Sequence, residues 1–178
     1  PLYSSAASDV YKRQGESRVA SDRKLFFPVP DVKLWDLENP VLYEVKTELL
    51  QNGNVLDENI TLFGFRTAVF LQDGFYLNGK KVKLRGLNRH QSYPYVGYAM
   101  PESMQKRDAD ILKNELGVNA VRTSHYPQSR HFVERCDELG LLVFTEIPGW
   151  QHIGDEIWKK QAVENVKDMV EQYRNHPS

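Results

Sequence analysis

Polar and ring-bearing side chains gather at three points of this sequence, each directly after a short apolar run. These points are Asn88-Arg89-His90, the stretch 122–127 (RTSHYP) and the stretch 146–152 (EIPGWQH). In parallel α/β folds the working residues lie at the carboxyl ends of the strands, so we expect the three points to meet on one rim. Tyr126 and Trp150 suit stacking against a sugar ring, and histidine and arginine suit hydroxyl groups. The residues alone therefore indicate a pocket for a polyol.

The elements that must position this rim begin near residue 82. We expect three short strands, over residues 82–87, 118–122 and 141–145. They alternate with three expected helices, over residues 104–116, 129–139 and 155–174. The expected N-caps are Ser103, Ser129 and Asp155, and the expected stops of the first two helices are Gly117 and Gly140. This β-α-β-α-β-α order predicts a parallel sheet with helices outside it, and three such units do not close a barrel.

The segment before residue 75 is strand-like. Residues 41–49 alternate between apolar and polar types and lead to Asn52-Gly53, a pair typical of hairpin turns. Residues 59–70 are rich in β-branched and aromatic types, and Gly64 within them indicates a bulge. A further hairpin is predicted at Asn78-Gly79. We interpret residues 28–73 as the end of a β-sandwich.

The composition excludes several classes of protein. The 178 residues carry a formal net charge of −1, without the basic excess of a nucleic-acid binder, so we expect no nucleic-acid partner. The sequence has no run of about 18 apolar residues, so we expect no membrane span. The single cysteine, Cys136, can form no internal disulfide, and its helical spacing among apolar residues predicts a buried structural thiol.

The two ends of the chain differ from its middle. Residues 1–27 show no useful periodicity, and we expect a non-native or disordered segment with a partial strand there. The stretch 4–14 (SSAASDVYKRQ) is similar to translated sequencing adapters, so we interpret residues 1–14 as non-native. The other end, Asn175-His176-Pro177-Ser178, is a helix-stop sequence that should lead into another element. We therefore expect a fragment cut at both ends.

Several long motifs occur in series. The most specific is the stretch 119–127 (NAVRTSHYP), which is followed by Phe132-Val133, Asp137 and the stretch 140–144 (GLLVF). Around them lie the stretches 39–43 (NPVLY), 64–66 (GFR), 77–80 (LNGK), 85–90 (RGLNRH) and 175–178 (NHPS). In order and spacing these motifs, which cover residues 28–178, resemble glycoside hydrolase family 2.

The resemblance implies an immunoglobulin-like β-sandwich followed by a TIM barrel. It places the end of the sandwich at residues 28–73 and the first three βα units of an incomplete (β/α)8 barrel at residues 74–178. Members of the family hydrolyse β-linked sugars with retention, and retaining glycosidases use two carboxyl groups about 5–5.5 Å apart. In this family the acid/base glutamate follows the fourth barrel strand and the nucleophile follows the seventh. We therefore expect no catalytic residue in this chain and no activity of the chain alone.

The resemblance also implies substrate-binding residues. His90 and His125 should bind the sugar and its transition state. Arg122 should lie under the site and hydrogen-bond the nucleophile, which favours the ionised carboxylate. Asn88 and Glu146 should lie at or behind the rim.

Two of the rim residues have an alternative role that the sequence leaves open. Glu146 is either a direct sugar contact or a structural carboxylate paired with a neighbour such as Arg122. Trp150 is either a stacking surface or a packing residue.

We expect no cofactor and no metal. The magnesium-dependent β-galactosidases of the family carry Glu-x-His after the third barrel strand. Here Trp150-Gln151-His152 stands at that place, and tryptophan offers Mg²⁺ no oxygen ligand. His152 is then a rim or structural residue, and we expect His131 and His176 on the surface or at helix ends.

The resemblance favours cleavage of terminal β-galactosides, because the stretch 86–91 (GLNRHQ) is more similar to the galactosidase branch than to the glucuronidase branch. β-Glucuronidase and β-mannosidase are the alternatives within the family, and a non-catalytic carbohydrate-binding module is the alternative outside it. The expected partner is a β-linked sugar or oligosaccharide substrate. The localisation, in the bacterial cytoplasm or periplasm, and a homo-oligomeric state of the parent stay open.

Overall fold

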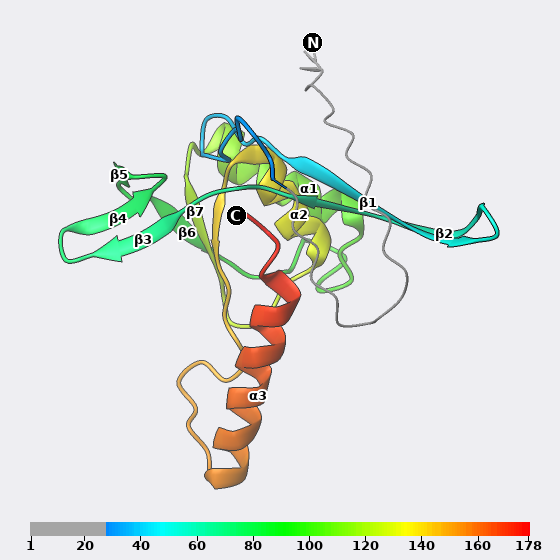
Figure 1. The fold of residues 1–178 in the computed structure, drawn as a ribbon. Coiled ribbons are helices and arrows are strands. Elements are labelled where there is room, and N and C mark those ends of the chain that lie inside the picture. The colour runs from blue at the N-terminus through cyan, green and yellow to red at the C-terminus, as the bar shows by residue number, and fades with distance from the viewer. Residues whose placement is uncertain (1–27) are drawn as a thin grey trace. The chain divides into compact units, whose positions relative to one another are not determined.

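The structure is a computed structural model, and it describes residues 28–178. The proposed non-native stretch 1–14 and the rest of residues 1–27 lie outside the described residues. The chain divides into two units, Pro1–Val32 and Lys33–Ser178, and every helix and strand of the described part lies in the second (Figure 1).

The first two strands form the expected hairpin. Strands β1 (Tyr43–Gln51) and β2 (Asn54–Phe63) pair antiparallel, from Tyr43 opposite Phe63 to Gln51 opposite Asn54. Asn52 and Gly53 between them have φ angles of 52° and 81°, as a two-residue hairpin turn of type I′ requires. The prediction of a hairpin at Asn52-Gly53 is confirmed.

A three-stranded antiparallel sheet follows, made of β3 (Ala68–Leu71), β4 (Gly74–Leu77) and β5 (Lys80–Val82). Asn78 and Gly79 form the turn between β4 and β5, which confirms the second hairpin. The expected strand over 59–70 is instead divided, because residues 64–67 belong to no strand. The bulge expected at Gly64 is therefore wrong. A Cβ there would lie 2.9 Å from side-chain atoms of both Pro177 and Trp35, so glycine is needed for close packing.

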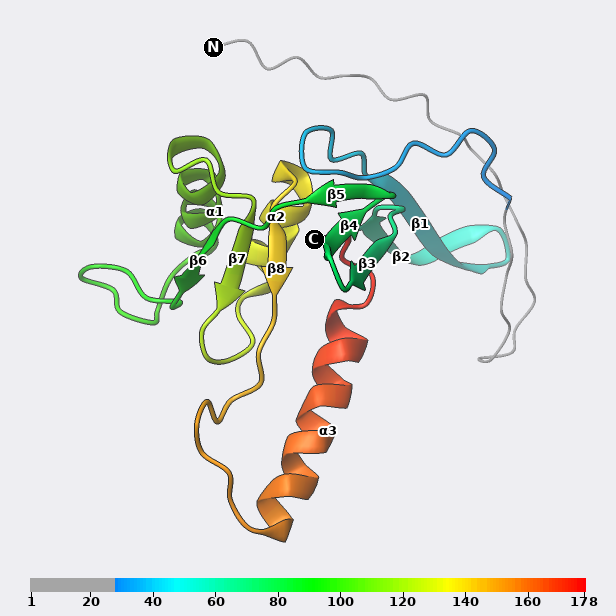
Figure 2. The same cartoon turned by 90° about the vertical axis from the view of Figure 1, so that its left-hand side faces the viewer.

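The third sheet is parallel and carries the expected rim. Strands β6 (Gly86–Arg89), β7 (Ala120–Thr123) and β8 (Leu142–Phe144) lie in this order, with Asn88 opposite Arg122 and Arg122 opposite Phe144. Figure 2 shows the three strands side by side with their arrowheads towards the same end. The parallel β-α-β-α-β order is confirmed, and the three strands form no closed barrel within residues 28–178. The first strand begins at Gly86 instead of residue 82, because Val82 pairs antiparallel in β5 and residues 83–85 belong to no strand.

The helices begin and end largely as expected. Helices α2 (Arg130–Leu139) and α3 (Glu156–Tyr173) are capped by the side chains of Ser129 and Asp155, and Gly140 ends α2 with a φ of 71°. Helix α1 (Glu102–Asp110) continues into the π-helical segment η1 (Ile111–Glu115). The N-cap expected at Ser103 is wrong, because Pro101 holds that position without a side-chain cap. Proline pre-sets the φ angle with which the chain enters the helix.

One apolar core holds β7 against α1 and α2. Its fully enclosed members include Ala109, Val121, Phe132, Cys136 and Leu141. Cys136 is buried, as expected, and burial raises the pKa of its thiol well above the ordinary value.

Helix α3, by contrast, exposes the apolar side chains of Ile157, Val163 and Val170. No helix of residues 28–178 is long and apolar enough to cross a membrane.

Candidate active-site rim

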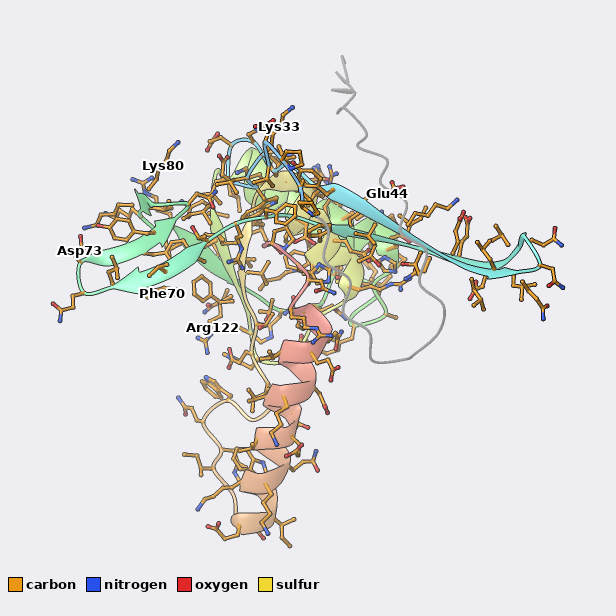
Figure 3. All side chains as sticks on the ribbon, in the orientation of Figure 1. Lys33, Glu44, Phe70, Asp73, Lys80 and Arg122 are labelled. Carbon is orange, nitrogen blue, oxygen red and sulfur yellow. The ribbon has the colours of Figure 1, made fainter. Side chains whose placement is uncertain are left out.

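Most of the residues expected to share a rim follow the carboxyl ends of β6, β7 and β8. His90 is the first residue after β6, His125 the second after β7, and Glu146 the second after β8. Arg122, labelled in Figure 3, lies in β7 with an exposed side chain. Asn88 is exposed opposite Arg122 on the neighbouring strand β6. The parallel register thus brings together residues that lie 58 positions apart in the chain, from Asn88 to Glu146.

Glu146 is the polar centre of the rim. Its Oε2 accepts a hydrogen bond from Nε of Arg122 at 2.8 Å, and its Oε1 accepts a second from Nη2 of Arg122 at 3.1 Å. The same Oε1 lies 2.9 Å from Nδ1 of His125. Of the two interpretations of Glu146, the pairing with Arg122 is the one that the structure shows. This pairing leaves Nε2 of His125 as the ring nitrogen that can face a ligand.

The surroundings of Glu146 favour its ionised form. Partial burial of the carboxyl group opposes ionisation, but hydrogen bonds from Arg122 and His125 outweigh it and lower the pKa of Glu146 below the ordinary value. The carboxylate is therefore negatively charged at neutral pH and compensates the charge of Arg122.

Two other rings contact the ring of His125. The indole of Trp150 stacks on the His125 ring at a centroid distance of 5.1 Å and an angle of 26°. The His90 ring meets the His125 ring edge-on at a centroid distance of 5.4 Å, and the Tyr126 ring lies 6.2 Å from that of His90. Trp150 is 63% exposed, so one face remains open for stacking. The rim combines open ring faces with hydrogen-bonding groups, a combination that suits a ring-shaped polyol.

The other histidines lie elsewhere. His152 packs edge-on against Trp158 at the start of α3, 5.4 Å between ring centroids. His131 lies on α2 within 3.8 Å of Glu102 and Glu134. His176 lies at the end of α3, as expected, and is partly buried, because its Nδ1 lies 2.5 Å from Oδ2 of Asp137. Hydrogen bonding to Asp137 raises the pKa of His176 despite burial.

Arg89, which the sequence predicts among the rim residues, is instead buried beside the rim. Its guanidinium bonds the Asp108 carboxylate at 2.9 Å and Oε1 of Gln105 at 2.8 Å, and it lies 3.9 Å above the centre of the Phe132 ring. Burial lowers the pKa of Arg89, and Asp108 partly offsets this effect. The sequence offered one indication that Arg89 could influence the rim, which is that it directly precedes His90.

No group of three or more metal-ligating side chains occurs within residues 28–178. The carboxylate that could serve a cation, Glu146, already accepts hydrogen bonds from Arg122 and His125.

The fold and the rim are those of an α/β domain whose candidate ligand site lies at the carboxyl ends of parallel strands. Comparison with family models makes this class specific. The model described as the TIM barrel domain of glycosyl hydrolases family 2 matches residues 69–178, and a second model, described as glycosyl hydrolases family 2, matches residues 2–66. The chain belongs to glycosyl hydrolases family 2. The second match begins inside the stretch 1–14, whose interpretation as non-native stays a prediction.

Individual relatives carry two different names. A β-galactosidase of Thermoanaerobacterium thermosulfurigenes is 58% identical over 176 residues, which are 99% of this chain and 23% of the relative. A putative β-glucuronidase of Formosa agariphila is 41% identical over 86% of the chain and 19% of its own length. Among solved structures, β-glucuronidase 3 of Bacteroides uniformis has a TM-score of 0.74 at 43% identity, over 82% of this chain and 19% of that one. The chain thus spans about a quarter or less of these relatives.

Proposed function

We propose that this chain supplies the first part of the sugar-binding rim of a retaining β-galactosidase. Residues 28–73 are then the end of the immunoglobulin-like sandwich, and residues 74–178 the first three βα units of the TIM barrel. The observation that carries the proposal is the cluster of Glu146, Arg122 and His125, with Trp150 stacked beside it, at the carboxyl ends of parallel strands.

Each rim residue has a role in the proposal. Nε2 of His125 and the ring of His90 bind sugar hydroxyls, and the exposed face of Trp150 stacks on the sugar or its leaving group. Asn88 supplies an amide at the edge. Arg122 is bound to Glu146 on one side, and its side chain is still 45% exposed. It can therefore also hydrogen-bond the carboxylate of the nucleophile.

The balance of charge on the rim favours a neutral sugar. In this proposal Arg122 is paired with Glu146 and with the carboxylate of the nucleophile, so its charge is already shared between two protein carboxylates and is not left for the carboxylate of a uronic acid. The 58% identity to a β-galactosidase points the same way. β-Glucuronidase is the second candidate, because relatives of that name are 41–43% identical. β-Mannosidase and a non-catalytic carbohydrate-binding module stay as further alternatives.

Both catalytic glutamates lie outside this chain in the proposal, and no cofactor takes part. The 178-residue chain alone should not hydrolyse any glycoside, whereas the full-length protein that contains it should do so without an added metal. No nucleic acid and no membrane take part, and the substrate is a β-linked sugar or oligosaccharide.

The test is a panel of aryl β-galactoside, β-glucuronide and β-mannoside with the full-length protein. We expect kcat/KM for the galactoside to exceed the other two by about a hundredfold or more, as expected when wrong substrates leave buried polar groups unpaired. A higher value for the glucuronide would favour the second candidate. Absence of hydrolysis of all three would favour a binding module, and activity of the 178-residue chain alone would contradict the placement of the catalytic glutamates.

A further inference from the structure

The two histidines of the rim lie on separate loops. His90 is on the loop after β6 and His125 is on the loop after β7. Their rings contact each other edge-on at 5.4 Å, and the His90 side chain is exposed. The position of the His90 ring relative to His125 therefore depends on how firmly the backbones of the two loops are joined.

The residues on either side of His90 are both joined to the second loop. Nη1 of Arg89 donates to Oε1 of Gln128 at 2.5 Å, and Nε2 of the same Gln128 donates to the carbonyl oxygen of Arg89 at 2.8 Å. One glutamine amide thus binds both the side chain and the backbone of Arg89. The pairing fixes the backbone directly before His90.

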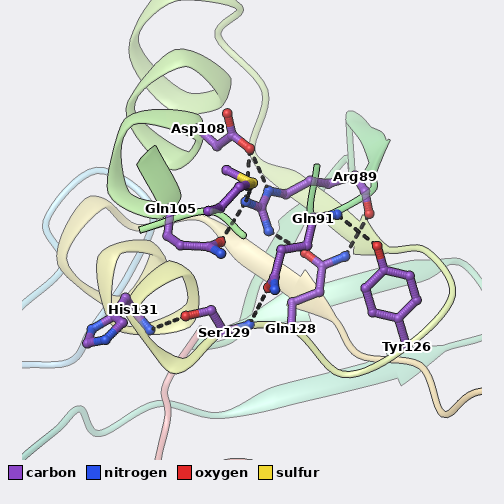
Figure 4. Close-up of polar contacts among 9 residues, drawn as sticks. Arg89, Gln91, Gln105, Asp108, Tyr126, Gln128, Ser129 and His131 are labelled. Carbon is purple, nitrogen blue, oxygen red and sulfur yellow. Dashed lines mark hydrogen bonds and ion pairs between the residues drawn. The ribbon is translucent and has the colours of Figure 1, made fainter. Parts of the chain in front are cut away.

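A second pair of bonds holds the residue after His90. The backbone N–H of Gln91 donates to the hydroxyl of Tyr126 at 3.0 Å, and Oε1 of Gln91 accepts from the backbone N–H of Ser129 at 2.7 Å. Tyr126 directly follows His125. We call Arg89, Gln91, Tyr126, Gln128 and Ser129 the clasp (Figure 4).

The clasp is anchored in the core. Arg89 and Gln128 are 5% and 4% exposed, and Arg89 is also bound by Asp108 and Gln105 of α1. The hydroxyl of Tyr173 donates to the carbonyl oxygen of Gln128 at 2.8 Å. The Arg89–Gln128 pair at the centre of the clasp is thus a buried polar network, and such networks hold one geometry when their groups are paired.

We propose that Gln128, Arg89 and Tyr126 are positioning residues that fix the spacing of His90 and His125 for the transition state. The inference rests on the proposed function, in which the two histidines bind the sugar. The three clasp residues contact no sugar and act only by holding the two histidines in place. We therefore expect the clasp to affect transition-state stabilisation more than ground-state binding. A displacement of about 1 Å in a reacting geometry can cost a hundredfold in rate.

The test uses two variants of the full-length protein. Tyr126→Phe removes only the hydroxyl that holds the backbone of Gln91, and Gln128→Ala removes both bonds to Arg89. For an aryl β-galactoside we expect kcat to fall about fivefold for Tyr126→Phe and about 30-fold or more for Gln128→Ala, with KM changed less than about twofold. The inhibition constant of a transition-state analogue should rise by the same factor as kcat/KM falls.

The control is Tyr76→Phe, which removes the same atom from a tyrosine whose hydroxyl donates to Asp73 on the β3–β4 hairpin. It should leave kcat, KM and analogue binding unchanged. If Tyr126→Phe and Gln128→Ala lower only the melting temperature and leave kcat and analogue binding as in the wild type, the clasp is structural and the inference is wrong. Wild-type protein that does not cleave the galactoside, or His125→Ala that keeps full activity, would instead refute the proposed function.

Discussion

His125 offers the sharpest prediction, because the structure separates its role from that of Glu146. Nδ1 of His125 lies 2.9 Å from Oε1 of Glu146, so Nε2 is the ring nitrogen that binds the sugar in the proposed function. Loss of one contact that strengthens in the transition state costs about 2.7–4 kcal/mol, or about 10²–10³ in kcat. In the full-length protein, His125→Ala should therefore lower kcat for an aryl β-galactoside about a hundredfold or more, together with kcat/KM and with little change in Tm.

Glu146→Gln tests whether the carboxylate acts through the histidine. Oε1 of Glu146 faces both His125 and Nη2 of Arg122, so an amide nitrogen there loses the bond to His125 or opposes the N–H of Arg122. A hydrogen bond to a charged group is worth about 1.5–3 kcal/mol, so kcat should fall about tenfold or more. With His125→Ala already present, Glu146→Gln should lower kcat further by less than about threefold, which corresponds to a coupling energy of about 0.7 kcal/mol or more.

The assay is a double-mutant cycle of kcat and Tm, with His131→Ala as the matched control on α2. His131 lies 3.6–3.8 Å from its acidic neighbours and away from the rim, so its loss should leave kcat nearly unchanged. Multiplicative effects of His125→Ala and Glu146→Gln would show that the two residues act independently. Equal behaviour of His125→Ala and His131→Ala, or unfolding of the first, would show that His125 is structural.

Three further predictions concern stability, the first two measured in the full-length protein and the third in the 178-residue chain alone. The hydrogen bond to Asp137 raises the pKa of His176. The contribution of His176 to the stability of the fold is therefore fully present below the ordinary pKa of about 6.5 and is lost as the pH rises through the raised value. The Tm difference between wild type and His176→Ala should shrink from about pH 6 to about pH 9. Gly140→Ala should lower the free energy of unfolding by more than about 1 kcal/mol in a urea titration, because φ is 71° and a Cβ would lie 2.5 Å from the carbonyl oxygen of Leu37. The 178-residue chain alone exposes large apolar side chains, each forgoing about 1.5–3 kcal/mol of burial, so calorimetry should show no sharp cooperative transition.

Sequence reasoning succeeded where a local rule decides the structure. Asn52-Gly53 and Asn78-Gly79 form turns because their backbone needs positive φ angles, and Ser129 and Asp155 cap helices because their side chains satisfy free N–H groups. The parallel order of β6, β7 and β8 followed from the alternation of strands and helices.

The errors and omissions of the sequence-based prediction arise from contacts between residues that lie far apart in the sequence. Gly64 serves the packing of Trp35 against Pro177, which lies 113 residues further along the chain. The helix-end position of His176 was expected, but its partner Asp137, 39 residues away in α2, was not. Arg89 looked like a polar neighbour of His90, yet it is buried because partners from α1 and from the loop after β7 surround it. The spacing of residues in the sequence does not predict such contacts.

The central claim is that the carboxyl ends of β6, β7 and β8 bind the sugar. A crystal structure of the full-length protein with a bound galactose-configured inhibitor tests it most directly. The account predicts a sugar oxygen within about 3.2 Å of Nε2 of His125, with His90 on the same sugar and Glu146 still bound to Arg122. An inhibitor that lies in the barrel mouth without contact to His90 or His125, or one bound elsewhere in the protein, would contradict the account.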